Sequence, residues 1–167
     1  MGERRAQMLA NPASALDIAL TNDDGWDAMG ITVMREALEA AGHTVTLAAP
    51  LYDQSGSSLA LDMSPLTVTK RAPGVYSVAL YPNAAVAAKP ANCALAAIGI
   101  VQESGHSPDL LVSGINTSAN IGMAAMLSGT VGAAGHAVAS VMNGPVPAIA
   151  VGTDEPACDS TCKRAHY

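Results

Sequence analysis

Residues 16–25 read LDIALTNDDG, an apolar run followed by an asparagine, two adjacent aspartates and a glycine. The apolar run predicts a buried strand over residues 16–21. In an open α/β sheet, the loop that leaves the carboxyl end of a strand is where ligands bind. Asp23 and Asp24 repel each other in such a loop unless a cation or strong hydrogen-bond donors neutralise them. The same residue types also favour turns and helix caps, so both a ligand site and an ordinary turn are open at this point.

The residues that follow predict a β-α-β unit. Apolar side chains at spacings of three and four indicate an amphipathic helix over residues 31–41, which Gly42 ends. A β-rich run over residues 43–49 then predicts a second strand, parallel to the first and joined to it by a right-handed crossover. Further elements are predicted at residues 66–70 and 75–81 (a hairpin or two short strands), 90–101 (helix), 109–113 (strand), 128–142 (helix) and 147–151 (strand). This alternation predicts an α/β fold with a mainly parallel sheet.

The amino-acid composition limits the packing and the partners of the chain. There is no Phe among the 167 residues, so small aliphatic side chains must form the core. The formal net charge is −6 and only eight residues are Lys or Arg, which argues against a nucleic-acid polymer as partner. A mononucleotide stays open, because metals and backbone amides can hold a phosphate without a basic surface. The longest apolar runs are interrupted well short of bilayer length, so no membrane partner is expected.

The cysteines do not predict a metal site or a disulfide framework. The three are Cys93, Cys158 and Cys162, an odd number without a C-x-x-C pair. Cys93 falls in a predicted helix and is expected to be a small core residue. A bridge between Cys158 and Cys162 stays open.

The two common nucleotide-binding motifs are missing from the sequence. A dinucleotide-binding fold would place G-x-G-x-x-G after the first strand, where this chain has Asn-Asp-Asp-Gly. A P-loop needs a lysine directly after a glycine, and no lysine of the chain has that neighbour. Any nucleotide site must therefore be built in another way.

Polar loops follow three predicted strands, and their residue types are those of a hard-cation site. The oxygen donors are Asp23, Asp24, Ser55, Asn116 and Asn120. Carboxylates, hydroxyls and amide oxygens suit Mg²⁺, Mn²⁺ or Ca²⁺ rather than zinc. Because parallel strands end at the same edge of a sheet, these loops are expected to meet.

A possible anion site is predicted beside these oxygen donors. Ser128, Gly129 and Thr130 open a predicted helix, where free amides and hydroxyls can bind an anion. A helix cap is the other interpretation of the same hydroxyls. Gly129, Gly132 and Gly135 lie three apart, so they are expected to share a face that packs closely.

With these motifs in order, residues 16–152 resemble the SurE family, the survival-protein E type nucleotidases and acid phosphatases. The motifs that carry the resemblance are LTNDDG at 20–25, GI at 30–31, AP at 49–50, QSGSS at 54–58, SGIN at 113–116, Asn120 with Gly122, SGTV at 128–131 and PAIA at 147–150. The resemblance implies a Rossmann-like three-layer α/β/α fold. It also implies metal-dependent hydrolysis of nucleoside monophosphates or other phosphate monoesters, as in a 5′/3′-nucleotidase.

The resemblance also implies roles for individual residues. The metal ligands fall on Asp23, Asp24, Ser55 and Asn116, and the expected cofactor is one divalent cation, Mg²⁺ or Mn²⁺, with Ca²⁺ open. Phosphate contacts fall on residues 128–130 and on Asn120. A water activated by the metal is the expected nucleophile, and a covalent role for Asp23 is the rival within enzymes.

Several features depart from the family pattern. Asn92 stands where an aspartate is usual before the central helix, and His136 where an acidic residue is common. The C-terminal portion expected of the family has no counterpart, and residues 153–167 predict an irregular tail. A truncated module that binds nucleotide or metal, or forms oligomers, without turnover is therefore the second hypothesis.

The remaining expectations concern organisation and location. Residues 1–15 predict a disordered leader without a complete secretion signal, and residues 16–152 the α/β domain. A cytoplasmic homo-oligomer, a dimer or a tetramer, is expected, with secretion or a periplasmic location left open.

Overall fold

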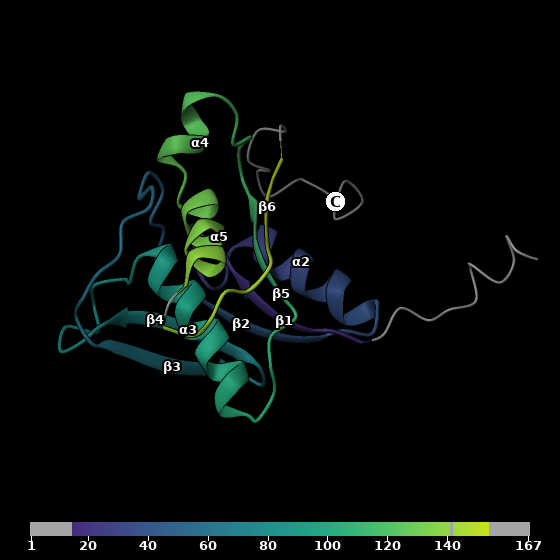
Figure 1. Cartoon of the computed structure of the whole chain (residues 1–167). Helices are drawn as coiled ribbons and strands as arrows, with labels where there is room; N and C mark the ends of the chain where they lie inside the picture. The colour runs from purple at the N-terminus through teal and green to yellow at the C-terminus, as the bar shows by residue number, and fades with distance from the viewer. Residues whose placement is uncertain (1–14, 141, 154–167) are drawn as a thin grey trace, which may run out of the picture.

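The computed structural model describes residues 15–140 and 142–153. Within that part of the chain, six strands form one sheet in the order β3-β4-β2-β1-β5-β6 (Figure 1). All neighbouring strands are parallel except β3 and β4, which form an antiparallel edge. The strands are β1 (Asp17–Thr21), β2 (Thr44–Pro50), β3 (Leu66–Ala72), β4 (Val75–Leu80), β5 (Leu110–Asn116) and β6 (Ala148–Gly152). The prediction of a mainly parallel α/β sheet is confirmed.

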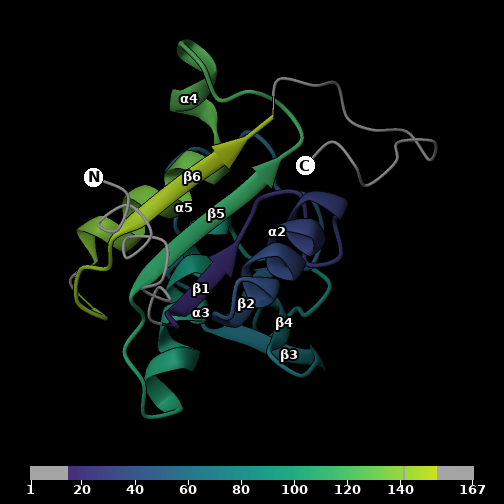
Figure 2. The same ribbon diagram turned by 90° about the vertical axis from the view of Figure 1, so that its right-hand side faces the viewer.

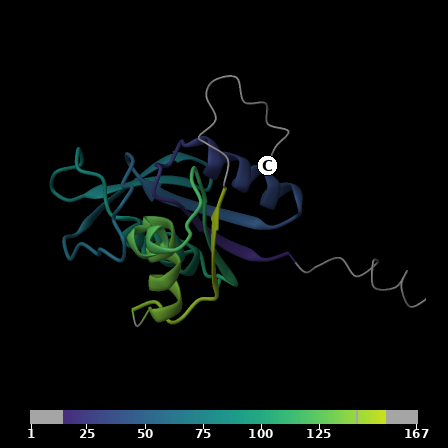
Figure 3. The same ribbon diagram turned by 90° about the horizontal axis from the view of Figure 1, so that it is seen from above.

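Helices cover both faces of this sheet and make the fold a three-layer α/β/α arrangement. Helix α2 (Met29–Ala40) lies on one face, and α3 (Pro90–Glu103) and α5 (Gly129–Ala139) lie on the other (Figures 2 and 3). Alternate side chains of one strand serve the two layers. Ile18 and Leu20 of β1 pack with the α2 side, and Ala19 packs against α3 and α5. The small side chains of α3 and α5 bring these helices close to the sheet, as the composition predicts.

The helix after β1 ends where the sequence predicts. Gly42 has a φ of 92°, which is the left-handed conformation that favours glycine. Its N–H donates to the carbonyl of Glu39, and the N–H of His43 donates to the carbonyl of Leu38. These bonds satisfy carbonyls at the helix end and turn the chain into β2.

The C-terminal helix differs from its predicted bounds. It ends at Ala139 rather than at Met142, and Gly144 then reverses the chain with a φ of 78°. The N–H of Val146 donates to the carbonyl of Ala137, while its side chain is buried in the α3/α5 core. The burial of Val146 therefore favours ending α5 at Ala139, and the chain continues from Val146 into β6.

A short helix was not predicted. Helix α4 (Met123–Leu127) has no buried residue and projects from the body of the protein (Figure 1). A helix of five residues without a buried face gives no apolar periodicity in the sequence.

The strand order places the expected site. Strand β1 lies between β2, which follows it in the chain, and β5, which comes much later. After β1 the chain adds β2, β3 and β4 on one side of β1, and it then crosses to the other side of β1 to add β5 and β6. Open α/β sheets bind ligands outside the carboxyl ends of the two strands at such a switch point, which here are β1 and β5. The predicted leader (1–15) and tail (153–167), with Cys158 and Cys162, lie almost entirely outside the described residues. In the described ranges, no helix has the length and apolar character needed to cross a membrane.

Candidate functional site

Asp23 lies at the centre of the candidate site. It lies just after β1, separated from the end of the strand by Asn22, and is only 3% exposed. Its Oδ1 accepts a hydrogen bond of 2.6 Å from Thr130 Oγ1, in the first turn of α5. A Cβ added at Gly129 would lie 2.9 Å from Asp23 Oδ2 and 2.9 Å from Pro90 Cγ. Glycine at this position therefore lets the starts of α5 and α3 approach the carboxylate.

Asp24 holds an oxygen that the surrounding residues leave unpaired. Its Oδ1 accepts a bond of 3.3 Å from Thr117 Oγ1, while its buried Oδ2 has no partner among the described residues. Burial, and next the neighbouring charge of Asp23, raise the pKa of Asp24 to about 6. A buried carboxylate oxygen without a donor is costly, and a bound cation would remove that cost.

Asn116 is the last residue of β5, and Asn120 lies in the loop that follows. Asn116 is 7% exposed, and its Nδ2 donates to the carbonyl of Ser118 at 2.8 Å and to Asn120 Oδ1 at 3.3 Å. The Nδ2 of Asn120 is buried without a partner among the described residues. Asn120 therefore holds a buried amide nitrogen that could donate to a ligand oxygen.

Ser55 reaches the site from the loop after β2. Its Oγ and its N–H both donate to Asp53 Oδ1, at 2.6 and 2.8 Å. The N–H of the preceding Gln54 donates to the backbone carbonyl of Asp23 at 2.7 Å, which joins this loop to the loop after β1.

The first residues of α5 are already hydrogen-bonded. Ser128 Oγ caps the helix by accepting from the N–H of Val131 at 3.2 Å, as the cap interpretation expects. The hydroxyl of Thr130 donates its hydrogen bond to Asp23. The free N–H groups of the first turn are then the donors best suited to an anion. Phosphate contact by residues 128–130 stays a prediction.

One cavity brings most of these residues together. It has a volume of about 200 Å³ and is lined by Asp23, Ser55, Asn116, Asn120 and Ser128, among others. Ala124 and Leu127 of α4 form part of its wall. Three other predicted site residues do not line it: Asp24, Gly129 and Thr130. Asp24 is bonded to Thr117, which does line the cavity, and Gly129 and Thr130 contact Asp23. Three loops distant in sequence therefore meet at one edge of the sheet, as predicted.

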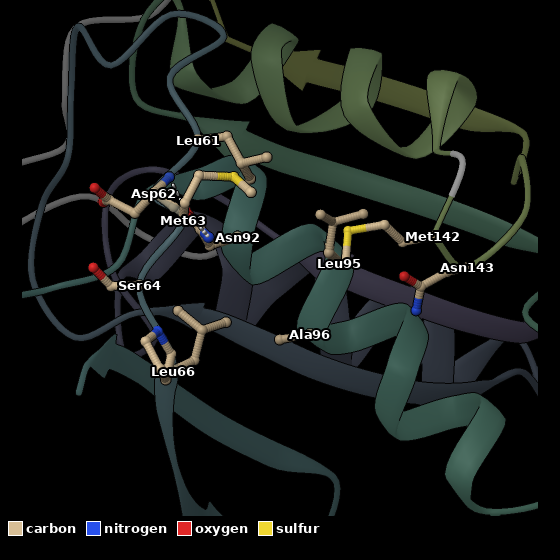
Figure 4. Close-up of a pocket in the computed structure, with 11 residues that line it drawn as sticks. Leu61, Asp62, Met63, Ser64, Leu66, Asn92, Leu95, Ala96, Met142 and Asn143 are labelled. Carbon is tan, nitrogen blue, oxygen red and sulfur yellow. Dashed lines mark hydrogen bonds between the residues drawn. The ribbon is translucent and has the colours of Figure 1, made fainter. Parts of the chain in front are cut away.

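A second cavity lies elsewhere, between α3 and the residues before β3. It measures about 280 Å³ and is lined largely by apolar side chains, among them Leu61, Met63, Leu95 and Met142 (Figure 4). Asn92 also lines it, and its side-chain amide accepts from the backbone N–H of Asp62 and donates to the carbonyl of Asp62. None of the predicted site residues lines this cavity.

The donor set fits a hard cation. Among the described residues there is no group of three or more His, Cys, Asp and Glu side chains that could by themselves hold a metal ion. Two carboxylates, a hydroxyl and amide groups remain, and one carboxylate oxygen lacks a donor. This is the chemistry of Mg²⁺, Mn²⁺ or Ca²⁺ sites.

Two residues of the site were not singled out from the sequence. Asp53 orients Ser55 and adds a third negative charge near Asp24. Thr117 donates to Asp24. Asp53 stands two residues before Ser55, and Thr117 directly follows Asn116, so adjacency to predicted ligands was the available signal.

Comparison with known proteins gives a consistent result. The family model described as Survival protein SurE matches residues 18–166. A 5'-nucleotidase SurE of Xanthomonas campestris pv. campestris (strain B100) is 42% identical over 118 residues, which cover 70% of this chain and 42% of that protein. One of Desulfovibrio desulfuricans (strain ATCC 27774 / DSM 6949 / MB) is 37% identical over 140 residues, covering 83% and 50%.

A solved structure is also similar. The crystal structure of the SurE protein from Aquifex aeolicus matches with a TM-score of 0.70 and 31% identity, over 84% of this chain and 52% of that one. The chain thus spans about half the length of the relatives it matches.

Proposed function

The chain belongs to the SurE family, and from this premise we propose that it is a metal-dependent phosphomonoesterase acting on nucleoside 5′-monophosphates. The observation that carries the proposal is the unpaired, buried Oδ2 of Asp24 beside the carboxylate of Asp23, at the carboxyl edge of the sheet. A cation site next to a helix N-terminus suits a phosphate ester, because the metal and the amides bind the same anion.

Asp23, Asp24, Ser55 and Asn116 would hold the divalent cation, Mg²⁺ or Mn²⁺, with Ca²⁺ as a further candidate. When bound, such an ion polarises a phosphoryl oxygen and lowers the pKa of a coordinated water. Their oxygen chemistry supports this assignment, as does the arrangement of Asp23, Ser55 and Asn116 around one cavity.

The protein's own groups would orient the substrate. Helix α5 begins beside Asp23, and the N–H groups of its first turn would donate to a phosphate bound there. Thr130 fixes the orientation of Asp23 by a short hydrogen bond. Asn120, with a buried and unpaired Nδ2, is a further donor for a substrate oxygen.

Water is the proposed nucleophile. Asp23 is 3% exposed and one of its oxygens already accepts from Thr130, which suits a ligand held in place better than a group that attacks phosphorus. The rival mechanism forms a phosphoryl bond to Asp23. Rapid quenching with ³²P-labelled substrate separates the two: label retained on Asp23 would overturn direct attack by water.

The test of the function is hydrolysis of nucleoside 5′-monophosphates and of p-nitrophenyl phosphate with Mg²⁺, Mn²⁺ or Ca²⁺. Activity that requires a cation and is abolished by Asp23→Asn supports the proposal. The second candidate is a module that binds nucleotide or metal without turnover. It draws on the observation that the chain spans about half the length of its relatives. Saturable nucleotide binding without hydrolysis under any of the three cations would establish it. Light scattering on the same sample tests the proposed homo-oligomer, a dimer or a tetramer.

A further inference from the structure

Lys89 is a cation next to the candidate site; it does not line the 200 Å³ cavity but is hydrogen-bonded to Gln54, the residue before Ser55. It directly precedes α3, and the next residue, Pro90, lies against the corner formed by Gly129 and Asp23. Its Nζ donates to Gln54 Oε1 at 2.9 Å. Gln54 is the residue before Ser55, and its N–H is bonded to the backbone of Asp23. The half-buried side chain of Lys89 therefore extends along the site edge, from α3 to the loop after β2.

The other described cations are placed or engaged elsewhere. The described residues include four Lys or Arg side chains. Arg35 pairs with Glu39 on α2, and Arg71 lies over the ring of Trp26 while donating to Ser77. Lys70 is exposed on the edge strand β3. Lys89 is thus the described cation that adjoins residues of the candidate site.

The ammonium of Lys89 has free donor capacity. It forms no ion pair with a described carboxylate, and its hydrogen bond to Gln54 is to a neutral amide. An ammonium has three N–H donors, so two remain after that bond. The half-buried ammonium can therefore donate two further hydrogen bonds, to water or to an anion bound at the site.

The charge balance of the site gives that anion a chemical class. The three aspartates carry up to three negative charges, and a phosphate monoester adds about two more near neutral pH. A divalent cation offsets only part of this sum. We propose that Lys89 is a phosphate-binding residue, which donates to a non-bridging oxygen of the substrate from the α3 side. This inference rests on the proposed function for its choice of anion.

The test compares the affinity of inorganic phosphate, measured by ³¹P NMR and calorimetry, in four variants of the whole chain. Lys89→Met keeps the length of the side chain and removes the charge, and we expect it to weaken phosphate binding about tenfold or more. Lys89→Arg keeps the charge and should recover most of this loss. Lys70→Met removes an equal charge from exposed β3 and should change the affinity less than about twofold.

Gln54→Ala separates phosphate binding from a tethering role. It breaks the same hydrogen bond as Lys89→Met but leaves the ammonium in place. If Lys89 only tethers the loop, both variants weaken phosphate equally, and that result overturns the inference. If Lys89 binds phosphate, Gln54→Ala retains the affinity, and the dependence of binding on ionic strength is shallower in Lys89→Met than in the unmodified chain.

The outcome also separates the inference from the proposed function. Phosphate binding that depends on Lys89 in a chain without hydrolysis refutes the enzyme and supports the inference. Hydrolysis with a KM and a phosphate affinity unchanged by Lys89→Met supports the enzyme and refutes the inference. A chain that neither binds phosphate nor hydrolyses a phosphate ester refutes both.

Discussion

Thr130 Oγ1 donates a hydrogen bond of 2.6 Å to Asp23 Oδ1, across 107 positions of sequence. The bond joins the first turn of α5 to the loop after β1, and both residues are buried, with 0% and 3% of their surface exposed. It therefore positions a candidate metal ligand and connects two layers of the fold. A polar pair of this kind contributes to stability and to the site together.

Thr130→Val should remove this bond while keeping the shape of the side chain. The buried Oδ1 of Asp23 then loses its donor, and we expect the free energy of unfolding in urea to fall by about 1–3 kcal/mol. Thr69→Val on exposed β3 is the matched control and should stay within about 0.5 kcal/mol of the unmodified chain. Equal stability of the two variants would show that the bond makes no net contribution to the free energy of unfolding.

Asp24 should make the stability of the metal-free protein depend on pH. Its pKa rises from 3.8 to about 6 on folding, so between these values the folded state binds more protons than the unfolded state. The free energy of unfolding should therefore decrease as pH rises through this window, and level off above about 6 as far as Asp24 is concerned.

Asp24→Asn removes this contribution. Urea unfolding in EDTA at several pH values, taken as the difference between the unmodified chain and Asp24→Asn, isolates it. A difference that grows in favour of the variant as pH rises from 4 to 6 agrees with the raised pKa. A difference that does not vary with pH would contradict it.

The positions of several candidate site residues could be predicted because apolar runs in the sequence show where strands end. Apolar runs gave β1, β2 and β5, and parallel order then brought the loops after them to one sheet edge. Asp23, Ser55 and Asn116 were candidates on residue type and position alone, and they line one cavity. Asp23 and Ser55 lie shortly after the ends of β1 and β2, and Asn116 is the last residue of β5, so the order of the strands is enough to bring them together.

What could not be predicted depends on three-dimensional contacts. Nothing local to Thr130 indicates that its hydroxyl meets Asp23 rather than a ligand, since that requires the placement of α5 against β1. Helix α4 has no buried face to leave a pattern. Asp53 resembles any loop aspartate until its two bonds to Ser55 are seen.

Divalent cations should stabilise the chain through Asp23 and Asp24. A ligand that binds only the folded state adds about 2.7 kcal/mol at a concentration of ~100 Kd, so the midpoint of thermal unfolding should rise with Mn²⁺ or Mg²⁺. Asp23→Asn and Asp24→Asn should each abolish most of this rise. Asp27→Asn removes an exposed charge from the same loop and should retain it. A rise that survives all three substitutions would place the cation elsewhere.

Gly132 and Gly135 of α5 should respond in opposite ways to alanine. A Cβ at Gly132 would lie 1.9 Å from the carbonyl oxygen of Ser58, which is backbone and cannot move aside without its loop. We expect Gly132→Ala to cost at least the ~1–3 kcal/mol typical of overpacking. Gly135 faces only the flexible Cδ2 of Leu59 at 3.4 Å, so Gly135→Ala should be neutral or stabilise the helix by about 0.5–1 kcal/mol.

The same pair tests whether the packing of α5 sets the site. Ser58 ends the QSGSS loop that carries Ser55, and its N–H and Oγ donate to the carbonyls of Leu127 and Met126. Displacement of this loop by Gly132→Ala should move Ser55 away from Asp23 and weaken Mn²⁺ binding in calorimetry, under conditions where the variant remains folded. Gly135→Ala, on the same helix, should bind Mn²⁺ as the unmodified chain does. If both variants bind the cation normally, Ser55 is not held in the site by the contact between Ser58 and α5.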